Sequence, residues 1–188
     1  MIKSKSDLKR FLDSDKRALH YKTQNKPRFG RDEIWKFEIL LRKNEYYTNV
    51  KKGVLSKISF AYYKYKFHKL SVKLGFSIPV NVFDEGLSIA HYGSIVVNQN
   101  ARVGKNCRIQ ENVTIGSTDG NDEAPTIGDN VFIASGVRVI GNITIGDRVS
   151  IGANAIVTKS FEENHITIAG VPAKKISDNG SDNFINID

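Results

Sequence analysis

The most regular feature of the sequence is an aliphatic residue at every sixth position of its second half. These residues lie on both sides of one interruption and are Val97, Val103, Ile109, Ile115, Ile127, Ile133, Val139, Ile145, Ile151 and Val157. A second small or branched residue usually follows four places later, as at Ala101 and Val113. A period of six is typical of a parallel β-helix, in which three short strands and three turns close a coil of about 18 residues. The pattern predicts a β-helix over residues 76–176 with these side chains pointing inward.

A polar segment interrupts this pattern at residues 117–125. The expected aliphatic position between Ile115 and Ile127 is occupied by Asn121, and its neighbours are polar or small. Such a segment cannot form a core strand, so we expect a loop extending from one corner of the β-helix. Loops on rigid scaffolds commonly carry function.

The six-residue pattern also changes register near His91. Ile89 and Ile95 are six residues apart, whereas Ile95 and Val97 are only two apart. In the earlier register His91 is at a corner and points outward, but in the later register it would enter the narrow apolar interior. Burying an imidazole there without a partner is unfavourable. The change of register therefore predicts that His91 lies on the surface.

Residues 1–75 have helical rather than six-residue spacing. We expect one helix to begin at Asp7 after a Ser6 cap, a second at Asp32, and a third over about residues 55–74. The third has an apolar stripe with lysines between its members: Phe60, Tyr63, Phe67, Leu70 and Leu74. Apolar residues at helical spacing usually pack on the protein itself. Contact of the basic helices with an anionic membrane surface is the less favoured alternative. Residues 177–188 are expected to be a flexible tail.

Charge and composition restrict the function further. Residues 1–76 contain 20 Lys and Arg against 7 Asp and Glu, while the rest of the chain contains 8 against 13. The first 76 residues thus carry a net charge of +13 and the rest −5, which together give +8, and we expect no nucleic-acid partner. The single cysteine, Cys107, excludes an intrachain disulfide and is at an inward position of the repeat. With no secretory signal and no long apolar segment, the chain is expected to be cytoplasmic.

Together these features resemble a known family. The hexapeptide run, the Ala90-His91-Tyr92-Gly93 segment, the loop, and the closing sequence from Ile168 to Lys174 are similar to the serine acetyltransferase-like branch of the hexapeptide acyltransferases. The resemblance implies a left-handed β-helix, a homotrimer with active sites between neighbouring subunits, and acetyl-CoA as co-substrate. No metal is expected, because only His91 and His165 lie in this half and no Cys/His cluster accompanies them.

Two departures from the family pattern concern the acceptor. Ala90 precedes the histidine where serine acetyltransferases have an aspartate, and Glu123-Ala124-Pro125 stands where they have Arg-His-Pro. The missing groups are those that hold the amino acid in the family. We therefore expect the acceptor to be a hydroxyl of a sugar or of a surface-polysaccharide precursor. Serine O-acetylation for cysteine biosynthesis is the first alternative, and a non-catalytic trimeric scaffold is the second.

The expected site centres on His91 as the general base, since an imidazole can accept a hydroxyl proton near neutral pH. Asp84 and Glu85 are candidates to orient it, and Tyr92 and Glu123 are further candidates on the acceptor side. A backbone N–H near Gly116 or Ser117 could stabilise the oxyanion. The resemblance places Ser117, Ser135 and Ala153 where the family contacts the cofactor. Gly116, Thr118 and Lys159 are further candidates for the same contact. Lys174 and Lys175 are expected to contact the CoA phosphates.

Overall fold

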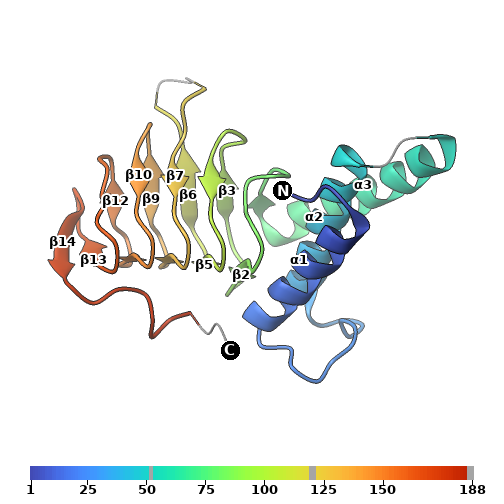
Figure 1. Cartoon of the computed structure of the whole chain (residues 1–188), viewed down its shortest axis with the longest axis horizontal. Helices are drawn as coiled ribbons and strands as arrows, with labels where there is room; N and C mark the ends of the chain where they lie inside the picture. The colour runs from blue at the N-terminus through green and yellow to red at the C-terminus, as the bar shows by residue number, and fades with distance from the viewer. Residues whose placement is uncertain (51–52, 119–121, 186–188) are drawn as a thin grey trace.

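The computed structural model describes residues 1–50, 53–118 and 122–185 of the chain. Three helices lie at one end of a prism of short strands (Figure 1). They are α1 (Lys5–Ala18), α2 (Glu33–Asn49) and α3 (Val54–Leu74). No helix within these described residues is both long enough and apolar enough to cross a bilayer.

The helices begin close to the expected positions, but their caps differ. Ser4 rather than Ser6 caps α1, because its hydroxyl accepts the backbone N–H of Asp7 at 3.0 Å. Asp32 precedes α2 in a left-handed conformation and makes no side-chain cap bond. Helix α3 ends at Gly75, whose φ of +78° lets the chain turn directly into the first strand.

The strands form three sheets, one for each face of the prism. Sheet A contains β1 (Phe76–Ser77), β3 (Ile95–Val97), β6 (Val113–Gly116), β9 (Arg138–Ile140) and β12 (Ile156–Val157). Sheet B contains β4 (Arg102–Val103), β7 (Thr126–Ile127) and β10 (Thr144–Ile145). Sheet C contains β2 (Ser88–Ile89), β5 (Arg108–Ile109), β8 (Phe132–Ile133), β11 (Ser150–Ile151), β13 (Thr167–Ala169) and β14 (Lys174–Ser177). The pairing of β13 with β14 is antiparallel, and the other pairings between these strands are parallel.

The repeat predicted from the sequence is confirmed as the core of a left-handed β-helix. Ile133 is paired with Ile151, which lies one coil of three hexads further along the chain. The coil that contains the interrupting loop is longer by one hexad, as the pairing of Ile109 with Ile133 shows. All ten aliphatic residues at the six-residue spacing are at most 4% exposed. Their side chains stack along the axis at the usual strand spacing of about 4.8 Å.

The inner face of α3 packs on the protein itself, as expected. Phe67 stacks on Phe37 of α2 with ring centroids 5.1 Å apart, and Phe76 meets Phe37 edge to face at 5.0 Å. Leu70 packs against the same core, and Leu74 is buried. The aromatic cluster therefore continues the core of the β-helix into the helical region.

A buried polar cluster also joins the helices to the β-helix. Arg42 of α2 is fully buried and bonds Asp15 at 2.7 Å and Glu45 at 3.1 Å. Its guanidinium also donates to the backbone carbonyls of Phe83 and Asp84. These bonds link two helices to one corner of the first coil.

Part of the C-terminal segment expected to be a flexible tail contacts the β-helix. Residues 178–185 run back along the β-helix, and Phe184 stacks on Phe132 with centroids 4.3 Å apart. Asp182 pairs with Arg148 at 2.5 Å and contacts His165 at 3.0 Å. The stacked ring and the ion pair hold this segment, which composition alone does not reveal. Residues 186–188 lie outside the described part of the chain.

Candidate active site

His91 lies on a corner of the β-helix that is longer than the corner stacked beside it. Ile89 pairs with Ile109 and Ile95 pairs with Val113, so five residues turn this corner where three suffice in the next coil. The two additional residues account for the register change seen in the sequence. His91 is exposed here, as that change predicts, and the neighbouring Tyr92 is 59% exposed.

The same corner carries a column of side chains, one from each coil. Glu111, Ser135 and Ala153 each follow, by two residues, a core isoleucine that continues the row begun by Ile89. They are therefore stacked beyond His91 at intervals of about 4.8 Å. The Ser135 hydroxyl donates a hydrogen bond of 2.6 Å to Glu111 Oε1. We call these four residues the His91 column.

Glu111 is the one carboxylate in the column, and sequence reasoning missed it. Its Oε2 is buried and has no hydrogen-bond partner among the described residues. The Ser135 hydrogen bond lowers the pKa of the Glu111 carboxyl most, and the electrostatic interaction with His91 adds a smaller lowering. His91 itself makes no hydrogen bond or ion pair with any residue in the described ranges. Glu111 follows His91 by one coil plus the two-residue insertion, and counting that interval along the sequence would have located it.

Gly93 allows the His91 corner to lie close to Glu111. Its φ is +135°, and a Cβ added there would lie 3.0 Å from the Cβ of Glu111. A side chain at this position would therefore be strained and crowded. The glycine keeps the imidazole and the carboxylate on adjacent levels of one corner.

The other side of sheet A carries the predicted cofactor residues Gly116, Ser117 and Thr118. Gly116 ends β6 and the other two follow it, and Ser117 Oγ accepts a hydrogen bond of 3.1 Å from Asn98. Lys159 follows β12 at the same corner and is exposed, with its ammonium 5.3 Å from the Phe161 ring centroid. The strands of sheet A separate this corner from the His91 column. Residues 119–121 of the loop, including Asn121, lie outside the described residues, and Glu123 is exposed near the end of the loop.

The closing segment lies beside the last strand of sheet A. The backbone N–H of Ala173 donates to Ile156 at 2.9 Å, and that of Ile156 donates to Gly170 at 3.0 Å. Lys174 is exposed and has no ion pair among the described residues, whereas Lys175 pairs with Glu163 and Asp178 at 2.6 Å each. Of the two lysines, Lys174 is thus the more available for an anionic ligand.

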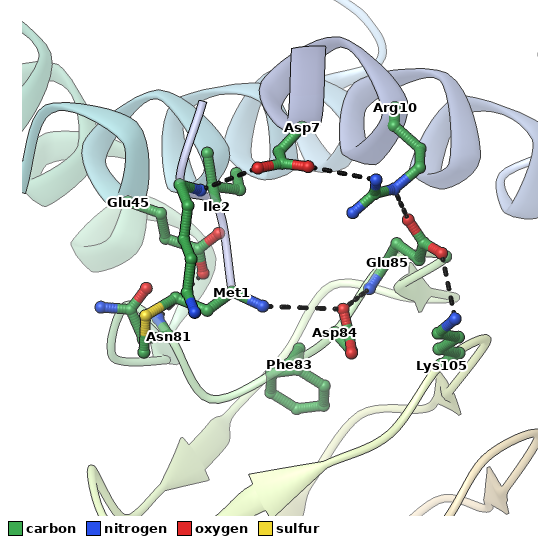
Figure 2. Close-up of polar contacts among 12 residues, drawn as sticks. Met1, Ile2, Asp7, Arg10, Glu45, Asn81, Phe83, Asp84, Glu85 and Lys105 are labelled. Atoms are coloured by element: carbon green, nitrogen blue, oxygen red, sulfur yellow. Dashed lines mark hydrogen bonds and ion pairs between the residues drawn. The ribbon is translucent and has the colours of Figure 1, made fainter. Parts of the chain in front are cut away.

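Asp84 and Glu85 lie at the third corner, between sheets B and C, away from the His91 column. Figure 2 shows both carboxylates directed toward the N-terminal segment and a neighbouring coil. Glu85 contacts Arg10 at 2.6 Å and Lys105 at 3.4 Å, and Asp84 is 3.9 Å from the terminal amino group. Asp84 also lines a cavity of about 340 Å³ that no member of the His91 column lines. The structure therefore does not bring these two carboxylates to His91.

The connection between α1 and α2 lies near the His91 corner. Tyr21 stacks on Trp35 with centroids 4.4 Å apart and donates to Asp32 at 3.0 Å. Burial raises the pKa of Tyr21 to about 12, with the Asp32 hydrogen bond next and a smaller contribution from Tyr92. The Tyr21 hydroxyl therefore stays protonated at neutral pH and adds no charge near His91.

Comparison with known proteins connects this architecture to a family. Residues 124–159 match the family described as bacterial transferase hexapeptide (six repeats). Serine acetyltransferase from Staphylococcus xylosus is 40% identical over 96 residues, which are 50% of this chain and 44% of that relative. The chain thus spans less than half the length of this curated relative.

Solved structures agree with the sequence comparison. Serine acetyltransferase from Brucella abortus strain S19 matches with a TM-score of 0.69 at 25% identity, covering 94% of this chain and 72% of that one. The same enzyme in complex with coenzyme A also matches with a TM-score of 0.69 at 25% identity, covering 94% and 70%.

These comparisons correct the expected acceptor. The departures at Ala90 and at residues 123–125 led us to expect a sugar or polysaccharide hydroxyl, but the matched relatives and structures are named serine acetyltransferases. The sugar assignment is therefore wrong: missing substrate anchors do not by themselves identify a different substrate. The β-helix of this chain thus resembles those of the hexapeptide-repeat transferases, and serine acetyltransferases are among the proteins similar to it.

Proposed function

We propose that this protein transfers the acetyl group of acetyl-CoA to the side-chain hydroxyl of serine, with His91 as the general base. One observation carries the proposal: an exposed imidazole lies on the irregular corner of the β-helix, one level from a carboxylate whose buried second oxygen has no hydrogen-bond partner among the described residues. The serine acetyltransferases among the matched proteins favour this acceptor.

The reaction needs one proton acceptor and one stabilised anion. His91 removes the serine hydroxyl proton as the oxygen attacks the thioester carbonyl. When the tetrahedral intermediate collapses, the carbon–sulfur bond breaks, and the imidazolium proton neutralises the CoA thiolate. The oxyanion donors expected near Gly116 or Ser117 lie across sheet A from His91 of the same chain, so in this proposal a neighbouring copy supplies them. The products are O-acetylserine and free CoA, so atoms and charges balance.

Glu111 is the proposed positioning residue for His91. Its carboxylate is on the adjacent level of the same corner, and its charge favours the imidazolium that forms during the reaction. Ser135 holds one oxygen at 2.6 Å, which leaves the other available to the imidazole. This arrangement assigns to Glu111 the role that we had considered for Asp84 and Glu85.

The outer face of sheet A is the proposed surface for acetyl-CoA. It is bordered by the His91 column on one side and by Ser117 and Thr118 on the other, with Lys174 near its end. Ser135 and Ala153 are small and leave space beside this face, and Lys174 supplies a cation for the CoA phosphates. A homotrimer would cover this face with a neighbouring copy, and sedimentation equilibrium of the full chain tests that assembly.

The proposal is tested by measuring free CoA thiol with acetyl-CoA and L-serine as substrates. We expect serine-dependent thiol release, with L-alanine as the matched control because it lacks the hydroxyl. His91→Ala should lower kcat by about 10²- to 10⁴-fold, the usual contribution of a general base, and leave acetyl-CoA affinity unchanged by calorimetry. If acetyl-CoA binds but serine causes no thiol release, or if His91→Ala retains full activity, the proposal fails.

A further inference from the structure

Helix α3 has a second apolar stripe on the face opposite its packed side. Its large side chains are highly exposed: Ile58 by 65%, Tyr62 by 56%, Tyr65 by 59% and Val72 by 70%. Their spacing places them on one side of the helix. The inner stripe that contains Phe67 and Leu70 packs on the core, so this outer stripe is separate from it.

The outer stripe lies within a strongly basic surface. Helix α3 contains five lysines and neither Asp nor Glu, and these lysines are Lys57, Lys64, Lys66, Lys69 and Lys73. The ammonium of Lys66 is 5.6 Å from the Tyr62 ring centroid, and that of Lys69 is 5.5 Å from the Tyr65 ring centroid. The exposed tyrosines are thus interleaved with cations.

An apolar groove between α2 and α3 continues this surface. The groove has a volume of about 690 Å³, and its apolar lining is Pro27, Ile39, Leu40 and Leu70. Five lysines also line it, and three of them, Lys66, Lys69 and Lys73, come from α3. Glu33 is the one acidic residue in this lining, and it contacts Lys36 at 3.1 Å and Lys73 at 3.8 Å.

We propose that this surface, formed by the outer stripe of α3 and the adjoining groove, binds an anionic lipid membrane. The lysines face the lipid phosphates, the tyrosines lie at the headgroup boundary, and the groove accepts acyl-chain carbons. Docking the same face of a second copy would bring five lysines against five without a compensating carboxylate on α3, which is unfavourable. Charge complementarity therefore favours the membrane over self-association, independently of the enzymatic proposal.

Vesicle co-sedimentation of the full-length chain tests this inference. Phosphatidylcholine vesicles with and without phosphatidylglycerol are compared at low and high salt, since screening weakens surface attraction. We expect binding only to the anionic vesicles, and less of it at high salt. Substituting Lys66, Lys69 and Lys73 by Gln should weaken this binding about 100-fold, from the usual contribution of three lysines near a charged surface.

The matched control replaces Lys9, Lys22 and Lys26 by Gln, which removes the same charge from exposed positions outside α3. This control should retain most of the binding, whereas Tyr62→Ser with Tyr65→Ser should reduce it. Equal binding to neutral vesicles, or equal losses in the two lysine variants, would overturn the inference. A drop in sedimentation mass of the tyrosine variant without vesicles would identify a second copy as the occupant and also overturn it. Circular dichroism verifies that each variant is folded.

Discussion

At the residue scale, the proposed site consists of one imidazole and one carboxylate that are 20 residues apart in the sequence and on adjacent levels of the fold. The motif around His91 led us to propose it as the general base, and the register change correctly predicted its exposure. Glu111 could not be chosen by proximity in sequence, because Asp84 and Glu85 are nearer to His91 along the chain. In the β-helix, residues one coil apart are neighbours, while Asp84 and His91 lie on different corners.

Glu111→Gln tests the positioning role without changing the size of the side chain. We expect kcat to fall about tenfold, equivalent to about 1.4 kcal/mol of transition-state stabilisation, with little change in the KM of either substrate. Steady-state kinetics measures this, and Ser135→Ala is the control that keeps the carboxylate but removes its hydrogen bond. A rise in the serine KM with unchanged kcat would instead mean that Glu111 binds the substrate ammonium.

A second measurement on Glu111 does not depend on activity. In His91→Ala we expect the Glu111 pKa to rise slightly, because the electrostatic interaction with His91 that helps to lower it is gone. Carbon-13 NMR titration of the carboxyl group measures this change. An unchanged Glu111 titration in His91→Ala would contradict the coupling between the two side chains.

At the element scale, the β-helix could be predicted almost entirely from the sequence, and the ends of the chain could not. Each inward position of the repeat has a similar apolar environment, so the same six-residue pattern predicts the strands of every coil. The cap at Ser4 and the packing of Phe184 on Phe132 depend on single contacts, which the periodicity of apolar residues cannot predict. The outer stripe of α3 was not identified from the sequence, because the inner apolar stripe was sufficient to predict an amphipathic helix.

Ile133 tests how strongly the stacked core supports the β-helix. It is fully buried between Ile109 and Ile151, so Ile133→Ala should remove about 2–5 kcal/mol from the free energy of unfolding. Ile133→Val, the conservative control, should cost about 0.5–1.5 kcal/mol. Urea unfolding followed by circular dichroism measures both, and equal losses in the two variants would argue against the tight packing described.

At the scale of the whole molecule, polar contacts join the helices to the first coil of the β-helix. Arg42 bonds carboxylates and carbonyls at one corner, and Glu38 Oε1 accepts the backbone N–H of Ile89 at 3.1 Å. Burial raises the pKa of the Glu38 carboxyl well above its usual value, with the nearby Asp15 charge adding to the effect. The contact between α2 and β2, the strand that precedes His91, thus contains a carboxyl group whose burial favours its protonated form.

Glu38→Gln tests this joint through the pH dependence of stability. When the native pKa is raised, the unfolded chain loses its proton first, so stability contributed by this group falls as pH rises above about 4.5. The Gln variant should therefore gain most in Tm relative to the native chain near pH 8 and least near pH 4. Differential scanning calorimetry measures the two pH profiles, with Glu162→Gln as the exposed control. Parallel profiles for the native chain and Glu38→Gln would refute the assignment.

The longer His91 corner has a consequence for stoichiometry. In a strictly regular β-helix every coil has the same surface, so a ligand would bind equally well at each coil. Two inserted residues remove that equivalence at the His91 corner, so in the proposed mechanism additional regular coils would not add a second reaction centre. In the proposed mechanism, the irregular corner, rather than the regular repeat, sets the position of the reaction site in each chain.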